Sequence, residues 1–169
     1  IFTSDNGPRI GSAKPLRGMK AETWEGGHRV PGIISWPNKI PKNKVVDDVL
    51  TTLDLFPTLL EVSGSDRMNE LDGRDISDFL SNPLEENLEE QPLFFYGRNG
   101  EMEAVRFGKW KLHIAKSRGW NKKKDGDFVI ALYDLDDDVS ETTDVSKLHP
   151  EIVEKLKSSI LEFEQELNK

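Results

Sequence analysis

The chain opens on Ile1-Phe2-Thr3-Ser4-Asp5-Asn6-Gly7-Pro8, in which an apolar pair leads into two adjacent oxygen-bearing side chains and a Gly-Pro turn. This order is typical of a buried strand that ends in a loop, which is where α/β proteins place their ligands. Asp5 and Asn6 supply hard oxygen donors of the kind that bind divalent cations. The segment therefore predicts an α/β fold with a ligand site at this strand end.

Two further segments near the start carry groups that suit an anion site. Leu16-Arg17-Gly18-Met19-Lys20 brings a compact cation, and Trp24-Glu25-Gly26-Gly27-His28-Arg29-Val30-Pro31 brings glycines that let the backbone approach a bound group closely. Taken alone, an Asp-Asn-Gly run more often forms a turn than a site. A single lysine is likewise more often a solvated surface residue. The three segments gain weight only from occurring together.

In this order the three segments resemble the formylglycine-dependent sulfatases of the arylsulfatase type, in the alkaline phosphatase superfamily. The family pattern is similar to Thr-Ser-Asp-Asn-Gly, then Leu-Arg-Gly-x-Lys, then Trp/Tyr-Glu-Gly-Gly-x-Arg-x-Pro, and the chain has all three. Met19 stands where a glycine is common, and Ala21-Glu22 replaces a frequent Gly-Thr, which indicates a stiffer loop. The segments 106–112, 132–135 and 141–144 also resemble landmarks of sulfatase C-terminal regions, so the resemblance covers nearly the whole chain.

The resemblance implies roles for three residues. Asp5 and Asn6 would be ligands of one divalent ion, usually Ca²⁺, which binds a sulfate oxygen and offsets its charge. Lys20 would contact the sulfate, as both a catalytic and a substrate-binding residue. Such enzymes attack with a formylglycine made from Cys or Ser in a Cys/Ser-x-Pro-x-Arg motif. The chain has neither this motif nor any cysteine, so we expect the formylglycine upstream and the chain alone to be inactive.

Composition limits the class of protein. The 169 residues suit one domain or one and a half, and no apolar run approaches the roughly 18 residues of a membrane helix. A net charge of −8 argues against nucleic-acid binding, which needs a basic face. An opening strand without neighbours predicts the C-terminal fragment of a longer sulfatase. The expected partners are its N-terminal part and a sulfated small molecule or glycan, with neither nucleic acid nor membrane.

We divide the chain into 1–88, the C-terminal portion of an alkaline-phosphatase-like α/β sandwich, and 89–169, a small α+β subdomain. In the first part the pattern predicts a strand over 32–37, a helix capped near Asp54 that docks through an apolar face and ends at Gly64, and a short helix before Asn82-Pro83. In the second it predicts an antiparallel sheet with strands over 92–97, 104–107, 109–114 and 128–133. A final helix beginning at Pro150 should cover one face of that sheet with Ile152, Leu156, Ile160, Phe163 and Leu167.

Several alternatives stay open. The protein is alternatively a phosphatase or phosphodiesterase of the same superfamily, which typically binds two zinc ions, or a non-catalytic fragment. We interpret His28 as a structural histidine and Arg29 as a brace that pairs with a carboxylate such as Glu25. Arg98, Asn99 and His113 are candidates for the rim of the pocket from the subdomain. The basic run over 116–124 is either a binding segment for a polyanion such as a sulfated glycan or a solvated hairpin tip, and we favour the hairpin tip. The compartment is unknown; the resemblance suggests a secreted, periplasmic or lysosomal protein.

Overall fold

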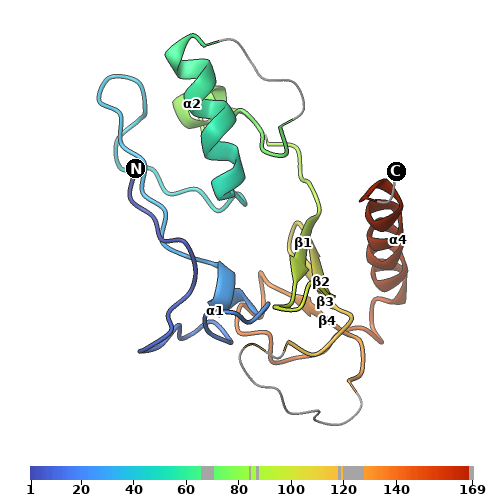
Figure 1. Cartoon of the computed structure of the whole chain (residues 1–169). Helices are drawn as coiled ribbons and strands as arrows, with labels where there is room; N and C mark the ends of the chain where they lie inside the picture. The colour runs from blue at the N-terminus through green and yellow to red at the C-terminus, as the bar shows by residue number, and fades with distance from the viewer. Residues whose placement is uncertain (66–70, 84, 87, 118, 120–127, 168–169) are drawn as a thin grey trace. The chain divides into compact units, whose positions relative to one another are not determined.

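The computed structural model describes residues 1–65, 71–83, 85–86, 88–117, 119 and 128–167. They fall into two compact units, one formed by Ile1 with 33–90 and the other by 2–32 with 91–169 (Figure 1). The second unit thus joins the beginning of the chain to its end. The division into 1–88 and 89–169 follows sequence position and stays a prediction.

A four-stranded antiparallel sheet forms the centre of the second unit. Its strands are β1 (Leu93–Tyr96), β2 (Met102–Phe107), β3 (Trp110–His113) and β4 (Ala131–Asp134), and they lie side by side in chain order. Short connections between strands of alternating pattern favour such a meander. The predicted α/β class and the antiparallel sheet are both confirmed.

The C-terminal helix α4 (Pro150–Leu167) packs on one face of this sheet. Val105, Leu112 and Leu132 come from three strands, and they form one buried cluster with Val153, Leu156 and Ile160 of α4. The predicted helix and its start at Pro150 are therefore confirmed. Its stripe needs one correction, because Val153 is buried while Leu167 is 64% exposed at the end of the helix.

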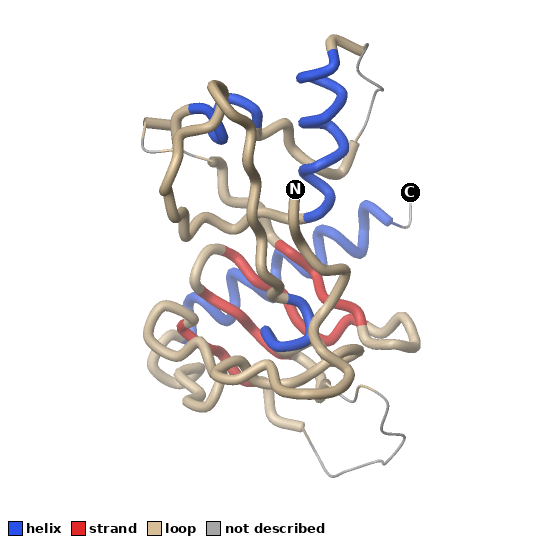
Figure 2. The backbone as a smooth tube through the Cα atoms, turned by 90° about the vertical axis from the view of Figure 1, so that its left-hand side faces the viewer, coloured by secondary structure: helices blue, strands red, loops and turns tan. Residues whose placement is uncertain are grey.

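The N-terminal segment covers the opposite face of the sheet. Figure 2 shows the one-turn helix α1 (Glu25–His28) on one side of the strands and α4 on the other. Trp24 packs with Ala131, Tyr133 and Leu135 in a second buried cluster. Side chains alternate between the two faces of a strand, so neighbours of the α4-facing residues point towards this segment. The motif region is thus part of the core of the second unit.

The first unit is built from the 3-10 helix η1 (Thr52–Asp54), α2 (Leu55–Ser63) and the short α3 (Ser77–Ser81). Asp54 is buried: it accepts a hydrogen bond from the Thr51 amide at 2.8 Å and forms an ion pair with Arg74 at 3.0 Å. These contacts cap the helix start and confirm Asp54 as a structural residue. The helix ends at Gly64 in the left-handed conformation, as expected.

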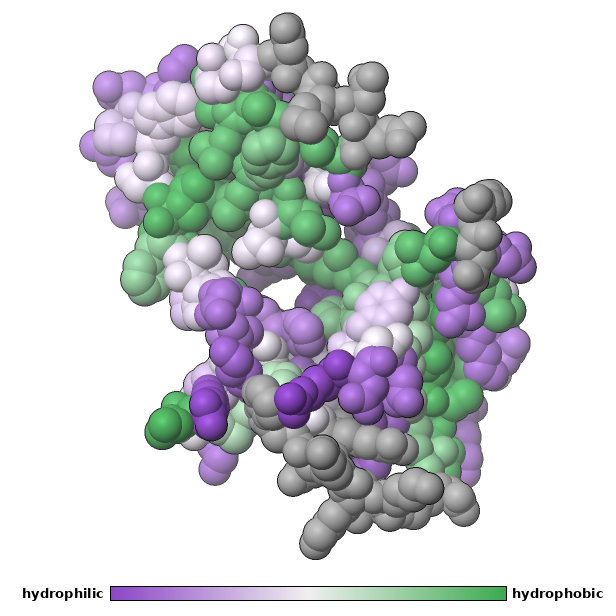
Figure 3. Space-filling model, viewed as in Figure 1, coloured by the Kyte–Doolittle hydropathy of each residue, from purple (hydrophilic) through white to green (hydrophobic). Residues whose placement is uncertain are grey.

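One side of α2 is apolar and exposed. Leu53, Phe56, Leu59 and Val62 are between 39% and 55% exposed, and Figure 3 shows a hydrophobic patch over this helix. The prediction of a helix docked through this face is therefore not met by the described part of the chain. Patches of this kind on a soluble protein usually mark a contact surface.

Two predicted strands are wrong. Residues 1–5 are exposed and form no regular strand, and 32–37 contain only an isolated bridge at Ile33. Phe2 and Ile33 each form only an isolated bridge, whereas a strand buried on both faces needs neighbours along its length to receive its hydrogen bonds. Among the described helices, none combines the length and the apolar character that spanning a bilayer requires.

Candidate active site

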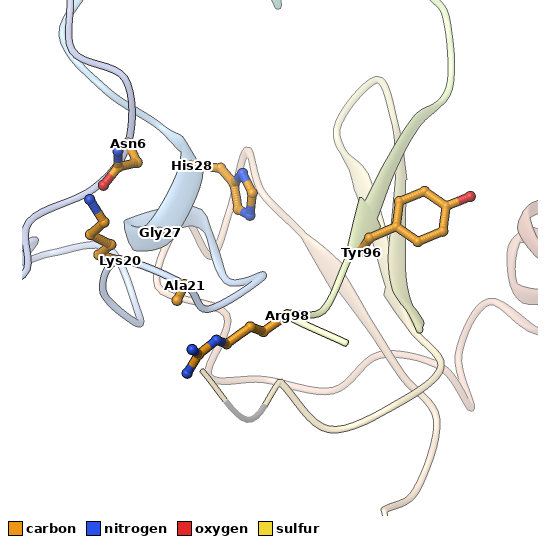
Figure 4. A pocket seen from close by; sticks show the side chains of 7 residues that line it. All are labelled: Asn6, Lys20, Ala21, Gly27, His28, Tyr96 and Arg98. Atoms are coloured by element: carbon orange, nitrogen blue, oxygen red, sulfur yellow. The ribbon is translucent and has the colours of Figure 1, made fainter. Parts of the chain in front are cut away.

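A pocket of about 270 Å³ lies in the second unit, between the N-terminal segment and the end of β1. Asn6 and Lys20, both predicted site residues, line one side of it (Figure 4). The full lining consists of Asn6, Lys20, Ala21, Gly27, His28, Tyr96 and Arg98. The structure therefore brings together two of the three residues that the motif singled out.

Backbone hydrogen bonds join the three motif segments at this pocket. The Gly7 amide donates to the Gly27 carbonyl at 2.8 Å, and the Lys20 amide donates to the Pro8 carbonyl at 3.1 Å. Asn6 directly precedes the first of these donors, and Lys20 is itself the second. The side-chain amide of Asn6 and the ammonium of Lys20 therefore extend from backbone positions that main-chain hydrogen bonds hold together.

Asp5 lies beside the pocket lining. Its side chain is exposed, and its Oδ1 accepts a 3.4 Å hydrogen bond from the Ser4 hydroxyl. Carboxylate and amide oxygens are donors that Ca²⁺ prefers, but the ion takes about six to eight ligands. Within the described ranges no three His, Cys, Asp or Glu side chains gather as a metal-binding group. Asp5 and Asn6 carry donor atoms of the kind that calcium takes, but the two residues alone would supply only part of its ligands.

The Lys20 loop is tightly folded against the Gly-Gly pair. A Cβ atom at Gly27 would lie 1.9 Å from the Glu22 carbonyl oxygen, so only glycine fits there. Ala21, which follows Lys20, has a φ of +73°, a conformation that costs a non-glycine residue about 1 to 2 kcal/mol. Glycine is common at this position of the family pattern, and the backbone explains why.

Beneath the pocket, the motif region is anchored by buried charges. Lys111 is fully buried and donates to Glu25 at 2.9 Å, while its Nζ lies 3.2 Å from Glu141. Arg106 also pairs with Glu25, at 3.0 Å. Burial raises the pKa of Glu25, but Lys111 and Arg106 outweigh this effect and hold it below the ordinary value. Two cations and two carboxylates thus balance, and we call these four residues the buried ion cluster.

His113 extends this cluster with a neutral ring. Burial lowers the pKa of His113, although the contact with Glu141 opposes the shift. Its Nε2 lies 3.1 Å from Glu141, so Nε2 carries the proton and donates it. Nδ1 is buried without a partner among the described residues. The ring also stacks on Trp24 with centroids 3.9 Å apart, which ties β3 to the motif region.

Some expectations about individual residues need correction. Arg106 and Lys111, not Arg29, form the ion pairs with Glu25. His113 lies buried below the pocket and does not reach its rim, and Asn99 is absent from the lining, whereas Arg98 does line it. Part of the basic run over 116–124 lies outside the described residues.

Sequence reasoning missed Lys111 and Glu141 as parts of this site. The amide of Glu25 donates to the Glu141 carboxylate at 2.7 Å, although the two residues are far apart in the chain. Glu141 belongs to a segment that resembles a family landmark and is flanked by Ser140 and Thr142, whereas Lys111 lies between apolar residues. Neither setting signals that the two are buried partners, so a single sequence could not reveal the pair.

Acidification should destabilise the second unit. The pKa of His113 lies below the value of about 6.5 expected in the unfolded chain. The unfolded state therefore binds more protons below that pH, and stability is lost as pH falls through the folded pKa. The pKa of Glu25 is also lowered, so this residue adds a second loss of stability as the pH falls below the ordinary pKa of a glutamate. Urea unfolding at about pH 7 and about pH 5 should show a lower free energy at the acidic pH.

Replacement of the titrating ring provides the control for this pH dependence. His113→Gln keeps a hydrogen-bond donor near Glu141 but does not titrate, so its free energy of unfolding should change less between the two pH values. His28 also has a lowered pKa, mainly because it is buried and secondly because of Lys111. It should therefore leave a smaller dependence of the free energy of unfolding on pH in this variant. A stability that stays constant or rises on acidification would contradict the prediction.

Comparison with known protein families covers most of the chain. The Sulfatase family model matches residues 1–65, and the model of the C-terminal region of aryl-sulfatase matches residues 88–169. The chain belongs to the sulfatase family. The two matches place the motif segments and the sheet with α4 in their expected family regions, which confirms the resemblance stated from the sequence.

Several curated sulfatases are similar to the chain. Arylsulfatase from Hemicentrotus pulcherrimus is 35% identical over 128 residues, covering 70% of this chain and 22% of that protein. Arylsulfatase G from Canis lupus familiaris is 31% identical over 177 residues, covering 86% of this chain and 32% of that protein. The chain thus spans a third or less of the length of these two relatives.

Solved sulfatase structures share the fold. The crystal structure of Ps i-CgsB in complex with k-i-k-neocarrahexaose matches 96% of this chain and 35% of its own, with a TM-score of 0.74 and 27% identity. The PsFucS1 sulfatase from Pseudoalteromonas sp. matches 95% of this chain and 36% of its own, with a TM-score of 0.74 and 25% identity. The sulfatase fold therefore extends over almost all of the chain.

Proposed function

We propose that this chain supplies part of the active site of a sulfatase that hydrolyses aryl or carbohydrate sulfate esters. In this proposal Asp5 and Asn6 are ligands of a calcium ion, and Lys20 contacts the sulfate group. One observation supports it above all: Asn6 and Lys20, from separate motif segments, line one pocket, and a main-chain hydrogen bond from Lys20 to Pro8 joins their two segments.

The residues of the chain would act by binding and by charge. The Lys20 ammonium would bind a sulfate oxygen and stabilise the charge that develops there as the ester bond breaks. Asn6 and Asp5 would hold Ca²⁺, which when bound supplies positive charge to the same sulfate group. The main-chain contacts between Gly7 and Gly27 would keep these groups oriented without rearrangement during the reaction.

The proposal requires the rest of a sulfatase domain as partner. That part would provide the formylglycine nucleophile and the other metal ligands, since the chain has no Cys/Ser-x-Pro-x-Arg motif. The exposed apolar side of α2 is a surface on which such a partner would bury Phe56 and Leu59. By itself the chain is expected to bind the sulfate ester but not to hydrolyse it.

The substrate class and the metal can be tested in one experiment. The chain alone and the complete sulfatase domain that includes it are assayed with 4-nitrophenyl sulfate, 4-nitrophenyl phosphate and bis(4-nitrophenyl) phosphate, and their bound metals are counted. We expect sulfate hydrolysis by the complete domain only, with one calcium ion bound. Faster phosphate-ester hydrolysis with two zinc ions would support the phosphatase or phosphodiesterase alternative. Hydrolysis of none of the three esters would indicate a non-catalytic protein.

A further inference from the structure

Arg17 and Lys20 belong to the same motif segment, but their side chains lie in different places. Figure 4 shows the Lys20 side chain directed towards Asn6 at the pocket. Arg17 is absent from the lining of this pocket, and its guanidinium lies 3.6 Å from the centre of the Trp24 ring. None of the proposed roles in sulfate hydrolysis uses this arginine.

Arg17 joins the loop that carries Lys20 to the chain that follows β4. Its guanidinium donates a 2.7 Å hydrogen bond to the main-chain carbonyl of Glu141. The hydroxyl of Ser140 makes a second link, because it donates to the Pro15 carbonyl at 2.7 Å. Two adjacent residues of the C-terminal part of the chain therefore hold the stretch that leads to Lys20.

Glu141 holds the other motif segment at the same time. Its carboxylate accepts the Glu25 amide, in the first turn of α1, at 2.7 Å, and it is buried against Lys111. The Arg17 carbonyl accepts a 2.7 Å hydrogen bond from the Gly26 amide of α1. The Lys20 loop, α1 and Glu141 thus form a closed ring of contacts, which the buried ion cluster ties to the sheet.

The anchor that receives Arg17 lies in a hydrogen-bonded turn. Asp138 accepts hydrogen bonds from the amides of Thr142 and Thr143, each at 2.7 Å, and its carbonyl accepts the Glu141 amide at 3.1 Å. Glu141 itself has a φ of +51°, a left-handed conformation that a non-glycine residue keeps only where surrounding contacts determine it. The carbonyl that Arg17 contacts therefore has a fixed position.

Placement of a charged group governs its effect on a transition state, and an error of about 1 Å can cost a large part of the rate. We propose that Arg17 is a positioning residue for Lys20: by binding the Glu141 carbonyl, it holds the loop so that the ammonium stays at the sulfate position. Arg17 itself does not touch the substrate. This inference deepens the proposed function and rests on it for the role of Lys20.

A double-mutant cycle in the complete sulfatase domain tests this role. With 4-nitrophenyl sulfate, Arg17→Gln should lower kcat about tenfold and change KM by less than about twofold, since Lys20 acts on the transition state. In a Lys20→Ala background the same replacement should change kcat by less than about twofold, because no ammonium remains to be positioned. Arg17→Lys keeps a donor for the Glu141 carbonyl and should recover part of kcat. Lys157→Gln removes one charge from the exposed surface of α4 and should leave kcat unchanged.

Hydrogen exchange of the Lys20 amide provides a readout that does not depend on turnover. This amide donates to the Pro8 carbonyl, so its exchange rate reports how firmly the loop is held. In Arg17→Gln the Lys20 amide should exchange about tenfold or more faster, while the amides of α4 keep their rates. A general loss of folding would instead raise both sets of rates.

Three results would overturn the positioning role: an unchanged Lys20 exchange rate in Arg17→Gln, an unchanged kcat, or an equal loss of kcat with and without Lys20. The last would show that Arg17 acts independently of the lysine. Failure of the proposed function is a different result, in which the complete domain hydrolyses no sulfate ester. The exchange rate alone then decides: faster exchange keeps the hold of Arg17 on the loop, and an unchanged rate removes it.

Discussion

Replacement of Lys20 by alanine is expected to lower kcat for sulfate-ester hydrolysis by about a hundredfold or more in the complete sulfatase domain. Lys20 lines the pocket beside Asn6, and its amide is fixed to the Pro8 carbonyl. In the proposed function its ammonium would meet the charge that builds on the sulfate in the transition state. The loss of that charge should not be recovered by raising the substrate concentration.

The matched controls separate this role from a loss of folding. Lys157→Ala removes a lysine from the exposed surface of α4 and should leave kcat unchanged. Asp5→Ala should lower activity through a weaker calcium affinity, which excess calcium would partly restore. Steady-state kinetics with 4-nitrophenyl sulfate, together with circular dichroism of each variant, measure these effects. Full activity of Lys20→Ala would show that Lys20 takes no part in sulfate hydrolysis.

The second large effect is expected for Lys111→Met, which should lower the free energy of unfolding by about 3 to 5 kcal/mol. Lys111 is fully buried and contacts both Glu25 and Glu141, and its ammonium lies 4.6 Å from the centre of the Phe95 ring. Methionine has a similar length but no charge, so it would leave two buried carboxylates with Arg106 as their remaining cation. Glu25 would keep Arg106, but Glu141 would be a buried carboxylate without a cationic partner, which makes the loss large.

Lys109→Met is the matched control for the buried lysine. Lys109 pairs with Asp134 at 2.6 Å, but its side chain is 41% exposed, and exposed pairs contribute only about 0 to 1 kcal/mol. Urea unfolding followed by tryptophan fluorescence compares the two variants. Adding Glu141→Gln to Lys111→Met should restore part of the stability, because Arg106 and Glu25 then remain as a balanced ion pair. Equal, small losses for both lysines would show that the buried ion cluster is dispensable.

Much of the secondary structure could be predicted from local patterns. The four strands, the start of α4 at Pro150 and the end of α2 at Gly64 each follow from periodicity or from capping residues. The strands expected at residues 1–5 and 32–37 failed, because a parallel strand depends on neighbours that local sequence does not contain. Local pattern likewise predicts the apolar face of α2. What covers this face depends on another part of a protein, which local sequence does not contain.

The sequence by itself determined the family and the candidate site residues Asp5, Asn6 and Lys20, because their types and order are local properties of the chain. Only the tertiary structure showed that residues 2–32 cover one face of the C-terminal sheet. It also decided that Lys111, in a strand of alternating charged and apolar residues, lies in the core and not in water. The physical reason is that the burial of a charge depends on partners such as Glu25 and Glu141, which only folding brings within hydrogen-bonding distance.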